Sequence, residues 1–122
     1  MMRQGITWAL CGIIVGLGVA GAAWAQDPVE VGPDIYTVKF ENERVRVSEI
    51  KFVPGASIAM HSHPDHFLYV LAAGTLQLGH PDGTTAEFVG TPGQVAWIPA
   101  ESHAAVNTGT TEFRGLVVEL KE

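Results

Sequence analysis

Three histidines are spaced so that they could hold one metal ion. His61 and His63 are two residues apart in the run Ser57 to His63, which has β-strand character. Because side chains alternate across a strand, both imidazoles are expected on the same face. His103 lies in a second strand-like segment, and a histidine from a neighbouring strand would complete a three-histidine site. Neutral imidazole binds first-row metals well, so the pattern predicts a site for one divalent transition metal.

On their own, two histidines spaced in this way are more often turn or surface residues than metal ligands. The flanking residues favour the metal site, because they resemble the two sequence motifs of the cupin superfamily. The first stretch reads Gly55, five residues, His61-Ser62-His63-Pro64, nine residues and Gly74. The second stretch reads Gly93, five residues, Pro99-Ala100-Glu101-Ser102-His103, three residues and Asn107. The resemblance covers residues 52–119.

The resemblance implies a small single-domain cupin, a β-barrel of jelly-roll type with one metal on the three histidines. Iron, zinc, manganese, nickel and copper all stay open as the metal. The resemblance further implies a small-molecule ligand inside the barrel and a homodimer, which would also cover strand edges that a small barrel leaves unpaired.

Two residues depart from the family's pattern. The first motif has a glutamate ligand at the place where this chain has Phe67, and Glu101 replaces a glycine of the second motif in a turn that is one residue shorter. Three neutral histidines bring no ligand charge, so the bound cation would be a stronger Lewis acid and would be held less tightly. Its open positions would be filled by water or substrate, as in catalytic zinc sites.

His66 is the candidate replacement for the missing glutamate. It is next to Phe67, and strand alternation is expected to point the two side chains in opposite directions. The Pro64-Asp65 turn leaves the local register open. His66 is therefore either a fourth ligand or a residue at the rim of the pocket.

Three aromatic residues and one glutamate complete the candidate site. Phe67 and Tyr69 are expected on the face of the paired histidines, and Trp97 is a candidate for the pocket wall; ordinary core packing is the alternative for each. Tyr69 is a candidate catalytic residue because a buried hydroxyl needs a partner. Glu101 is a candidate general base or additional ligand, and an exposed turn position is its alternative.

The elements that must position these residues all have β-strand character. No apolar run recurs at helical spacing behind a capping residue, and short β-type runs are separated by Gly, Pro, Asn and Asp. The chain is therefore expected to be all-β, closed or nearly closed. The expected strands are Ile35–Phe40, Val45–Val53, Ser57–His63, Phe67–Ala72, Thr75–Gly79, Thr84–Val89, Gln94–Ile98, His103–Asn107 and Phe113–Leu120.

The first 25 residues have the pattern of a secretory signal peptide. A short basic start ending at Arg3 precedes the apolar residues 6–23, and Ala23-Trp24-Ala25 matches a cleavage site. Cleavage after Ala25 would leave a flexible lead-in, residues 26–34, and a barrel domain, residues 35–122. The protein is then periplasmic or secreted; an uncleaved inner-membrane anchor is the alternative. After cleavage no membrane association is expected.

Composition excludes some partners and leaves two classes of function. The formal net charge of the 122-residue chain is −6, so nucleic acid is not an expected partner. The one cysteine, Cys11, lies in the signal segment, so the mature chain has no thiolate ligand. A metal-dependent enzyme of dioxygenase, isomerase or lyase type is one class. A non-catalytic module that binds or senses a small molecule or a metal is the other.

Overall fold

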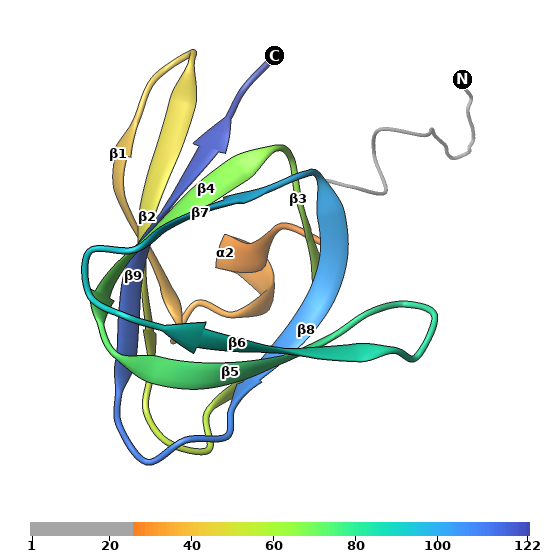
Figure 1. Cartoon of the computed structure of the whole chain (residues 1–122). Coiled ribbons are helices and arrows are strands. Elements are labelled where there is room, and N and C mark those ends of the chain that lie inside the picture. The colour runs from red at the N-terminus through yellow and green to blue at the C-terminus, as the bar shows by residue number, and fades with distance from the viewer. Residues whose placement is uncertain (1–25) are drawn as a thin grey trace.

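The computed structural model describes residues 26–122, so the signal segment lies outside the described residues. The expected all-β fold is confirmed (Figure 1). In the described part of the chain one short helix, α2 (Pro28–Val31), precedes nine strands. The strands are β1 (Tyr36–Glu41), β2 (Val45–Phe52), β3 (Ser57–His63), β4 (His66–Ala72), β5 (Gly74–Gly79), β6 (Thr85–Gly90), β7 (Val95–Ile98), β8 (Glu101–Asn107) and β9 (Phe113–Leu120).

The strands form two antiparallel sheets. One sheet has the order β1-β2-β9-β4-β7 and the other has the order β3-β8-β5-β6. Strands distant in the sequence, such as β2 and β9, are therefore neighbours, as expected of a jelly roll. The inward faces of both sheets make one apolar core, which surrounds the candidate site. Its buried members are Ile35, Tyr36, Ile50, Phe52, Ile58, Leu68, Val70, Leu76, Ala105, Phe113 and Val117.

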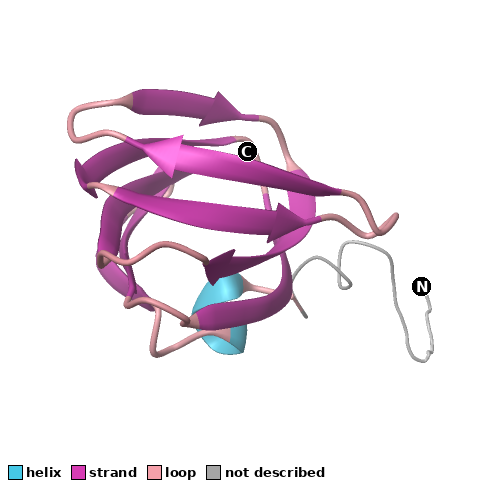
Figure 2. Cartoon of the chain, turned by 60° about the horizontal axis from the view of Figure 1, so that its bottom comes forward, coloured by secondary structure: helices cyan, strands magenta, loops and turns pink. Residues whose placement is uncertain are grey.

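The segment expected to be a flexible lead-in is instead a packed element. Asp27 caps α2 by accepting the Val29 backbone N–H at 2.9 Å, and a proline follows it at the first helical position. Both features favour a helix start. Asp27 also forms a two-point ion pair with Arg46 of β2. The helix packs against β3 and β1 (Figure 2), so this Asp-Pro pair is a helix signal that the sequence analysis missed.

A β-bulge in β3 decides where its histidines point. Ile58 is paired with Ala105, but His61 is paired with His103, so β3 has one residue more than β8 between these pairs. An extra residue of this kind changes the alternation of the strand. As a result Ile58 and His61, three residues apart, are both buried in the interior.

Within residues 26–122, no helix has the length and hydrophobicity needed to cross a membrane.

Candidate metal centre

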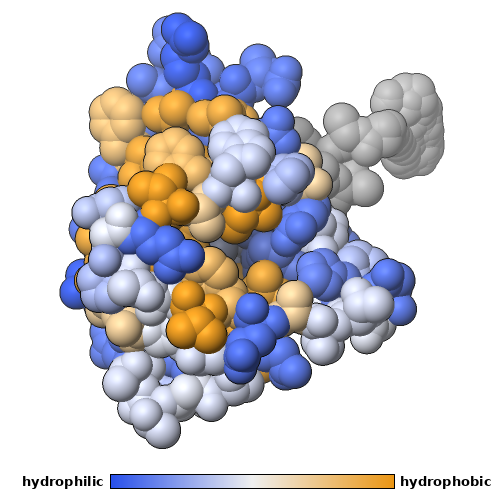
Figure 3. All heavy atoms as spheres, viewed as in Figure 1, coloured by the Kyte–Doolittle hydropathy of each residue, from blue (hydrophilic) through white to orange (hydrophobic). Residues whose placement is uncertain are grey.

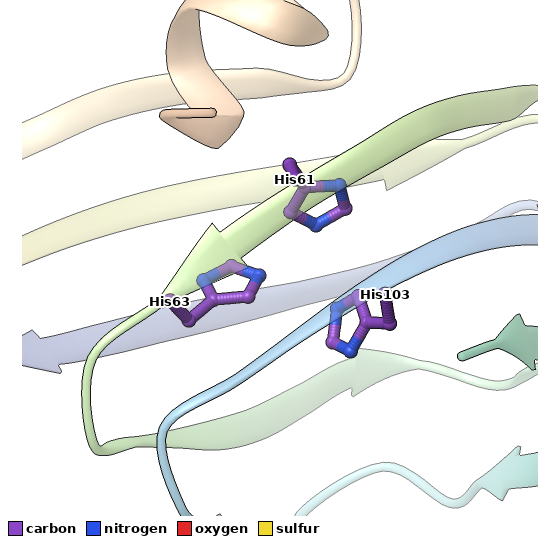
Figure 4. A group of neighbouring side chains, drawn as sticks. All are labelled: His61, His63 and His103. Carbon is purple, nitrogen blue, oxygen red and sulfur yellow. The ribbon is translucent and has the colours of Figure 1, made fainter. Parts of the chain in front are cut away.

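The three predicted ligands converge in the interior. His61 and His63 come from β3, and His103 comes from the neighbouring strand β8, directly opposite His61 (Figure 4). One ring nitrogen from each residue can be chosen so that all three atoms lie within 4.8 Å of one another. All three side chains are buried. The sheet register thus produces the cluster that the sequence spacing predicted.

Each of these imidazoles is held through its Nδ1 atom. His61 Nδ1 donates to the Ala59 carbonyl oxygen at 2.8 Å, which is a backbone group of the bulge. His63 Nδ1 donates to Glu119 Oε2 at 2.7 Å, and His103 Nδ1 donates to Glu101 Oε2 at 2.5 Å. A proton on Nδ1 leaves the lone pair of a neutral imidazole on Nε2. Hydrogen bonds of this kind orient histidines that ligate metals.

The Nε2 atoms fit a metal ion. Nε2 of His61 is fully buried and has no hydrogen-bond partner among the atoms of residues 26–122. Such an orphaned polar atom is costly unless something binds it. Burial lowers the pKa of His61 to about 4 and also lowers the pKa of His103. Both rings are therefore neutral near pH 7, which is the form that binds metals.

His66 joins the cluster from β4. Its side chain is buried, and its ring stacks on that of His63 with centroids 4.3 Å apart. Its Nδ1 donates to the Pro64 carbonyl oxygen at 2.8 Å, so its lone pair is on Nε2 as well. Burial lowers the pKa of His66 to about 4. His66 therefore lies in the interior and lines the same cavity as the other three histidines, and its role as a fourth ligand stays a prediction.

The histidines line a small cavity of about 60 Å³. Figure 3 shows hydrophobic side chains gathered on the face of the molecule that carries β7 and the β5–β6 hairpin. Half-buried Leu78, Phe88 and Ile98, from β5, β6 and β7, line the cavity. The remaining walls are also largely apolar. In addition to the four histidines and those three residues, the lining consists of Tyr36, Ile50, Phe52, Leu68, Leu76, Ala105 and Val117.

Comparison with solved structures now identifies the family. A cupin domain from Bordetella pertussis Tohama I is 33% identical to this chain with a TM-score of 0.67, and the match covers 72% of this chain and 93% of that domain. The chain is a cupin. A protein with a double-stranded β-helix domain from Klebsiella pneumoniae subsp. pneumoniae is 26% identical with a TM-score of 0.57, over 72% of this cupin and 84% of that chain.

The polyketide cyclase RemF from Streptomyces resistomycificus is 30% identical to this cupin with a TM-score of 0.55. That match covers 71% of this chain and 64% of RemF. No family model and no curated protein matches the sequence.

The expected placement of the three pocket aromatics is wrong. Phe67, Tyr69 and Trp97 do not line the cavity, and Tyr69 and Trp97 are 40% and 56% exposed. The physical reason is the corner between β3 and β4. After two residues of turn, the inward positions of β4 resume at His66 and continue at Leu68, so the odd-numbered residues face outward. The same shift turns His66 inward, while Phe67, which stands at the sequence position of the family's glutamate, does not line the cavity.

Glu101 has a different position from that of a general base. It does not line the cavity of this cupin, and its carboxylate accepts the Nδ1 proton of His103. It therefore holds a candidate ligand in place from behind. The turn that precedes it is closed by Asp65, whose carboxylate accepts the Ala100 backbone N–H at 2.9 Å.

Glu119 is a member of the site that the sequence analysis missed. It is 4% exposed and joins His63 to Arg46, which reaches Glu119 at 2.7 Å and Asp27 at 2.9 Å. Burial alone would raise the pKa of Glu119, but the hydrogen bond from His63 and the charge of Arg46 outweigh burial and lower it. A signal existed, because β9 buries every second residue from Phe113 onward and this alternation makes Glu119 an inward-facing charge.

Tyr36 was also missed. Its side chain is buried at the start of β1, and its hydroxyl lies 3.3 Å from Nε2 of His63. Burial raises the pKa of this phenol above its usual value, so it is protonated and can donate. No motif includes Tyr36, so only the three-dimensional structure brings it to the site.

Proposed function

We propose that this cupin binds one divalent transition metal through Nε2 of His61, His63 and His103 and acts on a small organic molecule in the adjoining cavity. The observation that supports this most strongly is the shared orientation of the histidines. Each donates its Nδ1 proton to a fixed acceptor, which leaves Nε2 of a neutral ring available to a metal, and one ring nitrogen from each lies within 4.8 Å of the others. Ordinary core histidines have no need of one common orientation.

His66 is the proposed fourth ligand. It is buried beside His63 and has the same Nδ1 anchoring, here to a backbone carbonyl. A metal at this site would supply Lewis-acid or redox chemistry, depending on the element. The carboxylates of Glu101 and Glu119 lie behind two of the imidazoles. They increase the basicity of those ligands and so offset part of the missing glutamate charge.

The cavity restricts the ligand to a small and mainly apolar molecule. Sites for drug-sized ligands usually enclose about 300–1,000 Å³, whereas this cavity has a volume of about 60 Å³. A polyketide of the kind that the name of RemF implies would not fit in this space. We therefore take from that relative the fold and not the substrate.

A binding or sensing module is the second candidate function. Its support is the lack of an obvious general base, since Tyr36 and the histidines are the only titratable groups that line the cavity within residues 26–122. A binder should be stabilised by its ligand without forming product. An enzyme should consume the ligand.

Elemental analysis tests the metal site. The full chain is exported by its own leader, purified without a histidine tag and compared with a His61→Ala/His103→Ala double variant. A His80→Ala variant is the matched control, because His80 lies in the β5–β6 turn and not in the cavity. We expect about one metal per chain in the parent and the control and none in the double variant. Metal-free protein in all three, with a Tm that zinc, iron and nickel do not change, would contradict the proposal.

We also propose that the protein is periplasmic or secreted, on the basis of residues 1–25 alone. Mass spectrometry of the exported protein tests this proposal. A chain that begins at Gln26 supports cleavage after Ala25, and a full-length chain in the membrane fraction supports the anchor.

A further inference from the structure

Tyr36 brings the one hydroxyl group to the cavity wall among residues 26–122. Its ring is edge-on to that of His61, with centroids 5.9 Å apart, and tilted toward that of His63 at 6.0 Å. The hydroxyl therefore lies beside two of the proposed ligands.

The hydrogen bond from Tyr36 uses an atom that a metal would take. Nδ1 of His63 carries the proton donated to Glu119, so Nε2 of His63 is the acceptor and the Tyr36 hydroxyl is the donor. Within the described part of the chain the hydroxyl has no second partner within hydrogen-bond distance. Once Nε2 of His63 is bound to a metal, its lone pair is no longer available. A buried donor without an acceptor is costly, so the hydroxyl then needs a new acceptor.

We infer that Tyr36 donates a hydrogen bond to an oxygen atom of a small carboxylate that binds beside the histidines, with the apolar part of that molecule against the hydrophobic walls. This inference rests on the proposed metal site and adds the chemical class of its ligand. The proposed direct ligands are all histidines, which bind a metal as neutral imidazoles, and the charge of Glu119 is shared with Arg46. An anion at the open position is therefore favoured by the charge of the metal. The cavity volume limits the molecule to a few non-hydrogen atoms.

Cobalt(II) provides a test whose signal does not depend on turnover. The purified protein is loaded with cobalt(II), and acetate is titrated in while the visible absorption of the metal is recorded. Tyr36→Phe removes the hydroxyl and keeps the ring. Tyr69→Phe is the matched control, because Tyr69 lies on the outer face. We expect acetate to bind about tenfold more weakly to Tyr36→Phe than to the parent and the control. Cobalt should bind Tyr36→Phe at least as tightly as the parent, because the hydroxyl no longer competes for His63.

The outcomes separate this inference from the proposed function. A parent protein that binds no cobalt contradicts the metal site itself. A parent that binds cobalt but not acetate, or a Tyr36→Phe variant that binds both as the parent does, overturns the inference and leaves the metal site intact.

A second measurement does not depend on the stability of Tyr36→Phe. The chain has two tyrosines, so Tyr36 is the one remaining tyrosine in Tyr69→Phe. Its near-ultraviolet difference spectrum should shift when acetate is added to the cobalt-loaded protein and should not shift with neutral acetamide. An acetate spectrum without that shift also overturns the inference.

Discussion

Glu119 accepts the Nδ1 proton of His63 at 2.7 Å, although the two residues are 56 positions apart in the sequence. Strand β9 brings the carboxylate beneath the histidine, and Arg46 of β2 holds it there through an ion pair. The orientation of one proposed ligand therefore depends on a residue in the last strand of the fold.

Glu119→Gln tests this dependence. An amide keeps the shape of the side chain but loses the charge that increases the basicity of His63. We expect metal affinity to fall by about 10–100-fold, the usual effect of removing such a partner. Competition titration with zinc and a chromophoric chelator measures it. Glu49→Gln is the control, since Glu49 pairs with Arg114 away from the cavity. Equal zinc affinities in all three proteins would exclude an orienting role for Glu119.

Acid should destabilise the metal-free protein before its carboxylates titrate. His61 and His66 have pKa values of about 4 in the folded state and about 6.5 when unfolded. Between these values the unfolded chain binds more protons, so the free energy of unfolding falls as the pH is lowered below 6.5 and is unaffected above it. We expect a loss on the order of 2 kcal/mol per histidine between pH 7 and pH 5. Urea titrations across this range measure it.

His66→Gln should remove the contribution of His66 and leave those of His61 and His103, whereas His80→Ala should leave the pH dependence unchanged. An unfolding free energy that is constant from pH 7 to pH 5 would mean that these histidines are not buried in the neutral form.

Gly74 and Gly79, at the two ends of β5, make a matched pair for packing. A Cβ atom on Gly74 would lie 2.7 Å from Phe113 Cβ and 3.1 Å from its Cα, whereas one on Gly79 would meet nothing within 4 Å. We expect Gly74→Ala to cost about 1–3 kcal/mol through overpacking. Gly79→Ala should be neutral or slightly stabilising. Thermal unfolding measures the difference in Tm between the two variants. Equal Tm values would contradict the close packing of Gly74 against Phe113.

The homodimer stays a prediction, and the outer face of the β4–β7 pair is where we expect it. Tyr69 is paired with Val95 and Phe67 with Trp97, and this apolar face is exposed at the edge of the sheet. Trp97→Glu should convert a dimer into a monomer in analytical ultracentrifugation. Val89→Glu adds a charge at an exposed residue of the other sheet, and it should leave the dimer intact. A parent protein that is monomeric at every concentration would contradict the prediction of a homodimer.

The motifs predicted the fold and three of the buried histidines because they encode turns and strand spacing. The strand bounds agree with the expected runs to within one or two residues, and Ser57–His63 and Phe113–Leu120 agree fully. Where a strand is regular, alternation alone predicts which of its side chains face inward. It failed at the corner between β3 and β4, where two turn residues changed which side chains of β4 face inward.

Contacts between distant strands could not be predicted in the same way. The approach of Tyr36 to His63 and the shared carboxylate of Glu119 follow from the order β1-β2-β9-β4-β7, which no short motif encodes. Only an inward-facing charge in β9 indicated part of that network. The short helix at Asp27 was missed because its signal is two residues long.

The alternation of β3 limits how the chain can change in length during evolution, except at its bulge. Residues can be gained or lost in the exposed turn after Gly79 without altering any of the four buried histidines. Loss of one residue at the bulge, Ala59 or Met60, would leave Ile58 and His61 two positions apart and both facing inward, whereas loss of Ser62 from the regular part of β3 would place His61 and His63 on opposite faces. A single deleted codon at Ser62 would therefore abolish the site while leaving every histidine in the gene.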